Sequence, residues 1–194
     1  MPKIVGASAR RVELAEAVWR VVCRDGLDHT SVRNVAVEAG LSTGSLRHSF
    51  GSQSELTVFA MRLVAERIAA RVEAVDVTGD PREVAERMIE EMLPLDRDRL
   101  VECQVWLAFS AQSVVDPHLG SLREEMHGRL LEAFTLIVDR IASPQADRTL
   151  EVHRLYALVD GLILHTVLHG EDPAVSRAVV RSHLSQLVNP TYEL

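Results

Sequence analysis

The sequence predicts an all-α protein of about nine helices, with a three-helix N-terminal domain and a larger helical domain after it. Its composition favours helices, because Ala, Leu, Val, Glu and Arg are abundant while the 194 residues include only 10 Gly and 7 Pro. Apolar side chains also recur at helical spacing along several segments. Several prolines directly follow an Asp or a Ser, which is the order of a helix cap and a first helical turn.

The first helix is expected over about residues 8–25. Its buried side carries apolar residues at helical spacing, namely Val12, Leu14, Ala15, Val18, Trp19 and Val22. Gly26 ends this helix, and Leu27 packs back against it. We expect Trp19 to be a core residue that joins this helix to the corner formed by residues 31–50, rather than a ligand contact.

Residues 31–50, SVRNVAVEAGLSTGSLRHSF, are predicted to form two short helices that meet at a tight corner. An apolar stripe marks the first helix and consists of Val32, Val35, Ala36 and Ala39. Gly40 ends that helix, because a residue without a Cβ can take the left-handed conformation. Leu41 fills the corner, and Ser42 is the expected N-cap of a second helix whose inward side chain is Leu46. This is the pattern of a helix-turn-helix.

The second of these helices presents polar side chains outward, namely Thr43, Ser45, Arg47 and His48. Small hydroxyls, a guanidinium and an imidazole are groups that a DNA major groove accepts and that can contact base edges. Either Thr30 or Ser31 can cap the first helix, and Arg33, one turn into it, is placed to meet a phosphate. The alternative is an ordinary helical corner whose polar residues face solvent. The order Ala, Gly, Leu, Ser, Leu favours DNA binding.

These residues resemble the TetR family of one-component transcriptional regulators. The family signature is matched by Ser31-Val32-Arg33, by the run from Ala39 to Phe50, and by the run from Ser52 to Leu56. Two positions depart from it, since Arg47 stands where the family usually has Tyr and Gln53 where it usually has Lys. Both positions tend to touch phosphates in the family. The resemblance implies DNA contacts from Thr30, Ser31, Arg33, Ser42, Thr43, Gly44, Ser45, Arg47, His48 and Gln53.

The charge distribution agrees with that interpretation. The whole chain has a formal net charge of -7, which by itself argues against nucleic acid. Residues 1–50, however, carry seven Lys/Arg against five Asp/Glu, whereas the remainder carries 14 against 23. The basic charge is therefore concentrated in the segment with the motif, as a DNA contact requires.

Cysteine usage and hydropathy argue against a cysteine-based metal or redox protein and against a membrane protein. Cys23 and Cys103 match no metal or redox spacing, so each is expected to be a reduced thiol. No uninterrupted apolar run reaches the length of a membrane span, because Asp160 and His165 break the longest candidate. We expect a cytoplasmic protein that has no membrane partner and needs no cofactor.

A long helix is expected over residues 52–75, where it would join the DNA-binding part to the rest of the chain. We place the helix-turn-helix domain at residues 1–51 and an effector-binding and dimerisation domain at residues 52–194. Helix starts in the second domain are marked by Asp80-Pro81, Asp116-Pro117, Ser143-Pro144 and Asp172-Pro173, with another at Asp96 or Asp98. The expected helices are 81–93, 97–113, 117–142, 144–169 and 173–188.

A small-molecule site is expected around the segment 97–113, because the family resemblance implies an effector site in this region. An apolar cavity with a few polar groups on its wall is what such a site requires. Its candidate residues are Met61, Glu102, Trp106, Phe109, Gln112, Met126, Leu130 and Tyr156. The alternative, that Trp106 and Phe109 are simply core residues, is favoured by residue type alone.

A dimer interface is expected on the last two helices. The segment from Leu155 to His165 is apolar almost all round, so it must be buried on several sides, in a core or against another chain. The candidate interface residues are Leu158, Gly161, Leu162, His165, Val180, Leu184 and Leu187. Paired with their twofold copies, the two helices would form a four-helix interface. Packing within one chain is the alternative. This region also resembles the BetI-like subgroup, which supports the dimer but does not imply its choline-related ligand.

Enzymatic chemistry finds little support. Glu124 and His127 have the spacing of one di-iron ligand pair, but a di-iron bundle requires a second such pair and none is present. His165 and His169 could chelate a metal but lack a neighbouring glutamate as general base. We therefore expect no metal site and no catalysis.

The sequence predicts a homodimeric, ligand-responsive repressor that binds a palindromic double-stranded DNA operator, with an unknown small-molecule effector. The alternative is a helical ligand-binding or protein-interaction module that does not bind specific DNA.

Overall fold

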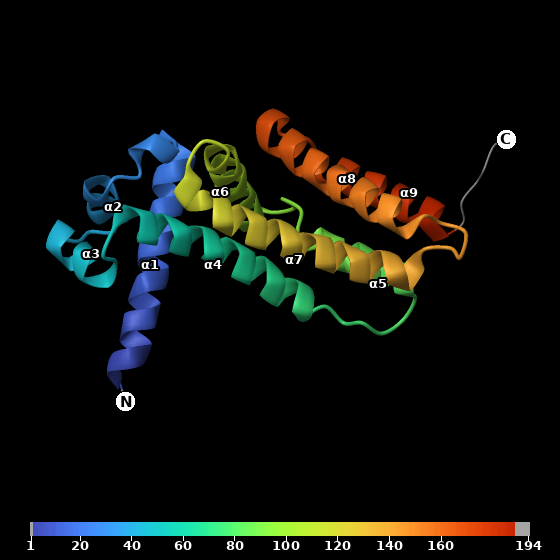
Figure 1. The fold of residues 1–194 in the computed structure, drawn as a ribbon, viewed down its shortest axis with the longest axis horizontal. Helices are drawn as coiled ribbons and strands as arrows, with labels where there is room; N and C mark the ends of the chain where they lie inside the picture. The colour runs from blue at the N-terminus through green and yellow to red at the C-terminus, as the bar shows by residue number, and fades with distance from the viewer. Residues whose placement is uncertain (1, 189–194) are drawn as a thin grey trace. The chain divides into compact units, whose positions relative to one another are not determined.

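The computed structural model describes the backbone of residues 2–188 and the side chains of residues 9–117 and 119–188. All the regular secondary structure in this part of the chain is helical, and it contains no strand (Figure 1). Its elements are α1 (Pro2–Asp25), the short 3-10 helix η1 (Leu27–His29), α2 (Val32–Glu38), α3 (Thr43–Ser49), α4 (Gln53–Glu73), α5 (Pro81–Glu90), α6 (Arg97–Ser113), α7 (Pro117–Ile141), α8 (Arg148–His169) and α9 (Pro173–Val188). None of the described helices is long and apolar enough to cross a membrane.

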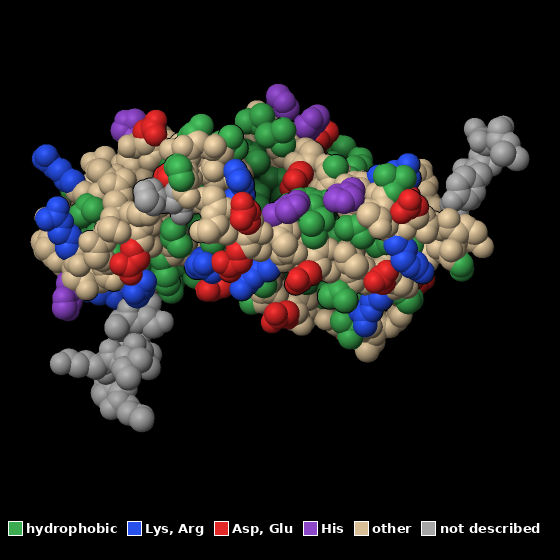
Figure 2. Space-filling model, viewed as in Figure 1, with side chains coloured by type: hydrophobic (Ala, Val, Ile, Leu, Met, Phe, Trp, Pro, Cys, Tyr) green, Lys and Arg blue, Asp and Glu red, His purple; other side chains and the backbone are tan. Residues whose placement is uncertain are grey.

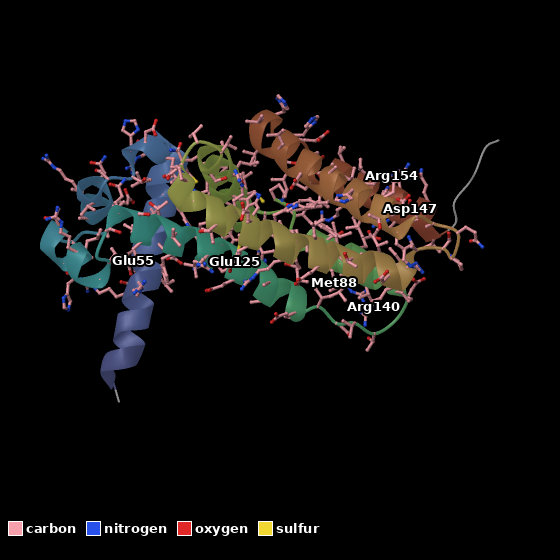
Figure 3. The ribbon with its side chains drawn as sticks, viewed as in Figure 1. Glu55, Met88, Glu125, Arg140, Asp147 and Arg154 are labelled. Atoms are coloured by element: carbon pink, nitrogen blue, oxygen red, sulfur yellow. The ribbon has the colours of Figure 1, made fainter. Side chains whose placement is uncertain are left out.

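The predicted all-α class is confirmed, but three helix ends differ from the prediction by about three residues or more. Helix α1 begins at Pro2 instead of about residue 8, and α5 ends at Glu90 instead of residue 93. Helix α8 begins at Arg148 instead of residue 144, because the expected cap at Ser143 is not used. Asp147 caps α8 instead, since its carboxylate accepts a hydrogen bond of 3.1 Å from the backbone N–H of Leu150 (Figure 3). The N–H of Ser143 donates to the carbonyl of Leu187, which makes this position part of a turn.

The chain forms two compact units. Unit 1 consists of residues 1–67 and 104–123, and unit 2 consists of residues 68–103 and 124–194. Helices α4, α6 and α7 therefore contribute residues to both units. The functional division that the sequence suggests, at residue 51, stays a prediction.

Unit 1 is built on the buried face of α1. Leu14, Ala15 and Val18 of this helix are almost completely buried, as are Ala36 of α2 and Leu46 of α3. Burial of such side chains is the main favourable contribution to folding, at about 25 cal/mol per Å² of apolar surface. The two short helices of the corner are thus held by α1, and the predicted core of the motif is confirmed.

Trp19 fixes α4 against α1 within unit 1. Its indole N–H donates a hydrogen bond of 3.0 Å to the carbonyl of Ala60, and its ring is 4% exposed. The guanidinium of Arg67 lies 4.7 Å from the centre of the Trp19 ring and forms an ion pair with Glu16. Trp19 is therefore a core residue, as expected.

Unit 2 is a bundle in which α9 packs on both α5 and α8. Figure 1 shows α8 and α9 running side by side. Its fully buried side chains include Ile89, Phe134, Leu155 and Leu184. On the surface of the bundle, Arg181 joins α9 to α5 through hydrogen bonds of 2.6 and 2.9 Å to Glu86.

Candidate functional site

The corner between α2 and α3 is closed by backbone hydrogen bonds. Gly40 has a φ of 65°, which is the left-handed conformation that glycine adopts at little cost. The N–H of Leu41 donates to the carbonyl of Ala36 at 2.8 Å, and the N–H of Gly40 donates to the carbonyl of Val37 at 3.0 Å. This pair of bonds is a Schellman motif, which satisfies the last carbonyls of α2. The corner is a fixed structure rather than a loose loop.

Two serines cap the helices of this corner. The Ser31 hydroxyl accepts from the N–H of Asn34 at 3.2 Å, and the Ser42 hydroxyl accepts from the N–H of Ser45 at 3.1 Å. Both caps were predicted, and the choice between Thr30 and Ser31 is decided for Ser31. Thr30 is 3% exposed, and its hydroxyl donates to the carbonyl of Leu27 at 2.6 Å. Thr30 therefore stabilises the turn before α2, and its predicted contact with DNA needs to be withdrawn.

The remaining predicted DNA contacts lie together on the surface of α2, α3 and the start of α4. Side chains that are exposed are those of Arg33, Ser42, Thr43, Arg47, His48 and Gln53, with the backbone of Gly44 exposed and Ser31 and Ser45 half-buried. Figure 2 shows arginine side chains, in blue, over this part of unit 1. Among the described residues, neither Arg33 nor Arg47 has a carboxylate within ion-pair distance. Both guanidinium groups are therefore available to a phosphate or a base edge.

Other arginines of unit 1 stabilise the fold. Arg11 forms an ion pair of 3.2 Å with Glu55, and its guanidinium lies 4.3 Å from the Phe50 ring and 4.7 Å from the Phe59 ring (Figure 3). Such a cation between aromatic faces stabilises by about 0.5–1 kcal/mol at an exposed site. This arrangement fixes the start of α4 against α1.

A second group of charges fixes α2 against α1. Arg20 and Arg24 of α1 each lie 2.7 Å from a carboxylate oxygen of Glu38 at the end of α2. Hydrogen bonds from both guanidinium groups hold the pKa of Glu38 below its ordinary value. Local sequence patterns did not predict this group, because the partners lie 14 and 18 residues apart along the chain.

Arg10 differs from its neighbour Arg11. It is exposed, and its Nη2 donates a hydrogen bond of 3.1 Å to the hydroxyl of Ser45, on the outward side of α3. Arg10 was not among the predicted contacts. The basic pair Arg10-Arg11 was a signal in the sequence, but nothing local separates the two roles.

The predicted effector residues are divided between the two units. Met61, Trp106, Phe109 and Gln112 belong to unit 1, where Met61 and Phe109 are buried. Glu102, Met126, Leu130 and Tyr156 belong to unit 2, where Glu102 and Met126 are buried. For Phe109, exposed to 1%, the interpretation as a core residue is supported.

Glu102 has a structural partner. Its carboxylate accepts hydrogen bonds of 2.7 and 3.3 Å from Arg71, while its side chain is only 5% exposed. Arg71 also contacts Glu91, both at its carbonyl, 3.2 Å away, and at its carboxylate, 3.3 Å away. The carboxylate of Glu102 is thus engaged by the end of α4, which weakens its assignment as a ligand contact.

Tyr156 lies in a cluster of rings in unit 2. The Tyr156 hydroxyl is 3.2 Å from Nδ1 of His127. The centre of the Tyr156 ring lies 5.4 Å from the centre of the His127 ring and 5.2 Å from the centre of the Phe134 ring. Burial, with a smaller contribution from Asp160, raises the pKa of Tyr156 to about 12. Burial also raises the pKa of Asp160, which His127 partly offsets. Aromatic faces beside a carboxylate form an environment that can accept a cation or a polar aromatic group.

No metal centre is found in the part of the chain whose side chains are described. No group of three or more His, Cys, Asp or Glu side chains there could hold an ion. His165 and His169 meet edge to face with ring centres 5.7 Å apart, and His127 faces Tyr156 rather than a second ligand pair.

The predicted dimer residues divide into two sets. Four of them are buried in their own unit and provide little area to a partner: Leu162, Val180, Leu184 and Leu187. Leu158 and Gly161 are half-buried, and His165 is exposed. Other apolar side chains are exposed on the same helices, with exposed fractions of 42% for Leu164, 64% for Leu168 and 42% for Val175. A shallow groove also runs along α9 beside Val175, Val179 and His183.

Comparison with known proteins finds similarity to transcriptional regulators. Residues 81–189 match the family model described as BetI-type transcriptional repressor, C-terminal. The HTH-type transcriptional regulator PksA of Bacillus subtilis is 37% identical over 174 residues, which cover 87% of this chain and 83% of PksA. The regulator BetI of Burkholderia cenocepacia is 30% identical over 187 residues, which cover 93% of both chains.

Solved structures agree at the level of the fold. A transcriptional regulator from Rhodococcus sp. Rha1 superposes with a TM-score of 0.83 at 27% identity, covering 92% of this chain and 95% of that one. A transcriptional regulator from Saccharomonospora viridis, solved in complex with choline, has a TM-score of 0.77 at 23% identity, covering 92% and 96%.

Proposed function

The chain belongs to the TetR family of transcriptional regulators, with a C-terminal region of the BetI type, and on this premise we propose that it is a ligand-responsive repressor that binds a near-palindromic operator as a homodimer. As a transcriptional regulator it is expected to act in the cytoplasm and to catalyse no reaction. The alternative of a helical module without DNA binding is less well supported, because the regulators PksA and BetI match across the DNA-binding region as well.

The main support for this proposal is the surface of the corner between α2 and α3. A Schellman motif and two serine caps fix this corner, and Arg33, Thr43, Arg47 and His48 are exposed on it without an ion-pair partner among the described residues. A helix fixed in this way can enter a major groove at little entropic cost. Thr43, Arg47 and His48 would contact bases, while Arg33 and Gln53 would contact phosphates.

We assign dimerisation to α8 and α9. The exposed Leu164, Leu168 and Val175 support this assignment, because apolar side chains on adjacent helices are often covered by a partner. In a twofold dimer the two α3 helices would enter successive major grooves, with half-site centres about 34 Å apart. That geometry accounts for the expected palindrome.

The effector is proposed to be a small molecule that contacts the cluster of Phe134, Tyr156 and His127. The choline complex of the related fold from Saccharomonospora viridis supports a small-molecule effector in general. Binding would shift α4, which continues from Gln53 beside the corner to Arg71 beside Glu102. A coupling free energy of about 1–3 kcal/mol is typical, and it would weaken DNA binding about 5- to 150-fold.

The test is fluorescence anisotropy on duplex DNA from upstream of the protein's own gene, followed by selection from genomic DNA. We expect tight binding with two chains per site that resists competitor DNA. Arg47→Ala is expected to lower affinity at least tenfold, whereas the control Arg129→Ala, which removes an exposed unit-2 charge paired with Glu125, leaves affinity unchanged. Weak binding that disappears at moderate salt on every duplex, including the selected ones, would indicate phosphate attraction alone and contradict the proposal.

A further inference from the structure

We propose that Arg10 helps to select the operator sequence by orienting the hydroxyl of Ser45, so that Ser45 acts as a hydrogen-bond donor toward a base edge. The inference rests on the proposed function, because it concerns the surface that would face DNA. Arg10 of α1, outside the helix-turn-helix, would be a positioning residue. Ser45 of α3 would act as a hydrogen-bond donor.

The hydrogen bond between these residues has a defined direction. A guanidinium has only donors, so the bond of 3.1 Å from Nη2 of Arg10 uses a lone pair of the Ser45 oxygen. The hydroxyl of Ser45 keeps its own hydrogen for a second partner. Among the described residues, none accepts a hydrogen bond from that hydroxyl.

The surroundings of Ser45 restrict where this hydrogen can point. The backbone N–H of Ser45 is already bound to the hydroxyl of Ser42 at 3.1 Å, and the side chain is half-buried between α1 and the exposed face of α3. The guanidinium of Arg10 occupies one lone pair of the Ser45 oxygen, and its positive charge makes that oxygen a weaker acceptor and the hydroxyl a stronger donor toward the exposed side of α3. A serine without this neighbour can donate or accept, and it contacts either kind of base edge.

The consequence for base choice follows from the major-groove pattern. Guanine offers O6 and N7, adenine offers N7 and thymine offers O4 as acceptors, whereas cytosine offers only its N4 amino donor. A hydroxyl that is held as a donor therefore favours the first three bases and disfavours cytosine. One position in each half-site should carry this preference, and it should depend on Arg10.

Arg10 can be compared directly with Arg11, the next residue on α1. Arg11 is occupied by Glu55 and by two aromatic rings, so its role is structural. Arg10 has no carboxylate partner among the described side chains and reaches the outward side of α3. The two adjacent arginines thus have separate functions. A phosphate contact from Arg10 alone would not require its hydrogen bond to Ser45.

The experiment measures the affinity of the full-length protein for its operator and for every single base-pair variant of one half-site. The wild type is compared with Arg10→Ala, Arg10→Lys, Ser45→Ala and the double variant Arg10→Ala/Ser45→Ala. Arg129→Ala serves as the control, because it removes the same charge at an exposed site of unit 2, where Arg129 pairs with Glu125. Unchanged melting temperatures would show that the variants fold, as expected for substitutions at the surface.

We expect the wild type to discriminate against cytosine at one position by about 5- to 150-fold. Arg10→Ala and Ser45→Ala should each reduce that discrimination to a similar extent, and the double variant should reduce it no further. Arg10→Lys should restore part of it, since an ammonium also donates. Discrimination at other positions, and all binding by Arg129→Ala, should stay the same.

Two results would overturn the inference. If Arg10→Ala weakens binding to all duplexes equally and lowers the salt dependence, Arg10 is a phosphate contact. If Arg10→Ala changes neither affinity nor base preference, it has no role on DNA. A wild-type protein that prefers no sequence would instead contradict the proposed function, and it would be recognised before any variant is compared.

Discussion

Replacing Arg71 by alanine is expected to destabilise unit 2 by removing the partner of a buried carboxylate. Arg71 donates hydrogen bonds of 2.7 and 3.3 Å to Glu102, whose side chain is only 5% exposed. Removing one partner of a fully buried pair costs about 3–5 kcal/mol, because the remaining charge is left without compensation. The Arg71 side chain is 29% exposed, so water reaches the pair, and we expect a smaller loss of roughly 2–3 kcal/mol.

The assay is urea denaturation at a fixed protein concentration, because the stability of the proposed dimer would depend on concentration. For a chain of this length, a loss of 2–3 kcal/mol corresponds to a fall in melting temperature of about 4–12 °C. The matched control is Arg129→Ala, because Arg129 is 59% exposed and lies 3.5 Å from Glu125 on the same helix. Exposed pairs of this kind contribute about 0.3–0.5 kcal/mol.

A second substitution separates loss of charge compensation from loss of packing. Glu102→Gln in the Arg71→Ala background removes the uncompensated charge, so the double variant should recover part of the lost stability. The reasoning is refuted if Arg71→Ala unfolds like the control, or if the double variant is no more stable than Arg71→Ala alone. Either result would mean that Glu102 does not need its partner.

Three further predictions concern single positions. Gly40→Ala should cost about 1–2 kcal/mol of unfolding free energy by urea denaturation, because Gly40 has a φ of 65°; an unchanged midpoint would contradict this. Cys103, whose pKa burial raises to about 12, should react with a disulfide reagent at pH 8 only after unfolding, and reaction in the native protein would show that the site opens. Burial lowers the pKa of His183 below 6.5, so the unfolded chain takes up a proton before the folded one and stability should fall as pH drops below 6.5. His183→Gln should weaken that fall in denaturation curves measured from pH 8 to 5, and an identical pH profile would exclude His183 as its source.

The sequence alone determined the local structure of the helix-turn-helix. The caps at Ser31 and Ser42, the left-handed Gly40 and the inward Leu46 were all predicted, because each depends on residues within about one helical turn. The lengths of α6 and α9 and their starts were predicted for the same reason. The family, too, was recognised from this segment, since its signature is a local pattern.

Only the tertiary structure decided the roles of residues whose partners are distant in the chain. Glu102 was expected to face a ligand, but it pairs with Arg71, which is 31 residues away. Ser143-Pro144 resembled a helix start, but the turn there is held by Leu187. Helical spacing shows which side of α9 is apolar, but not whether its own chain or a second one covers that side, and Val180 and Leu184 are covered by their own unit.

Arg10 and Arg11 show most simply that local sequence cannot assign a role that depends on distant partners. The two residues are adjacent, identical and on one helix, so no local pattern can distinguish them. A helix turns by about 100° per residue, however, and the two guanidinium groups therefore meet different neighbours. Arg11 meets Glu55, 44 residues away, and Arg10 meets Ser45, 35 residues away. Which arginine stabilises the fold and which reaches the outward side of α3 was decided by the packing of α3 and α4 on α1.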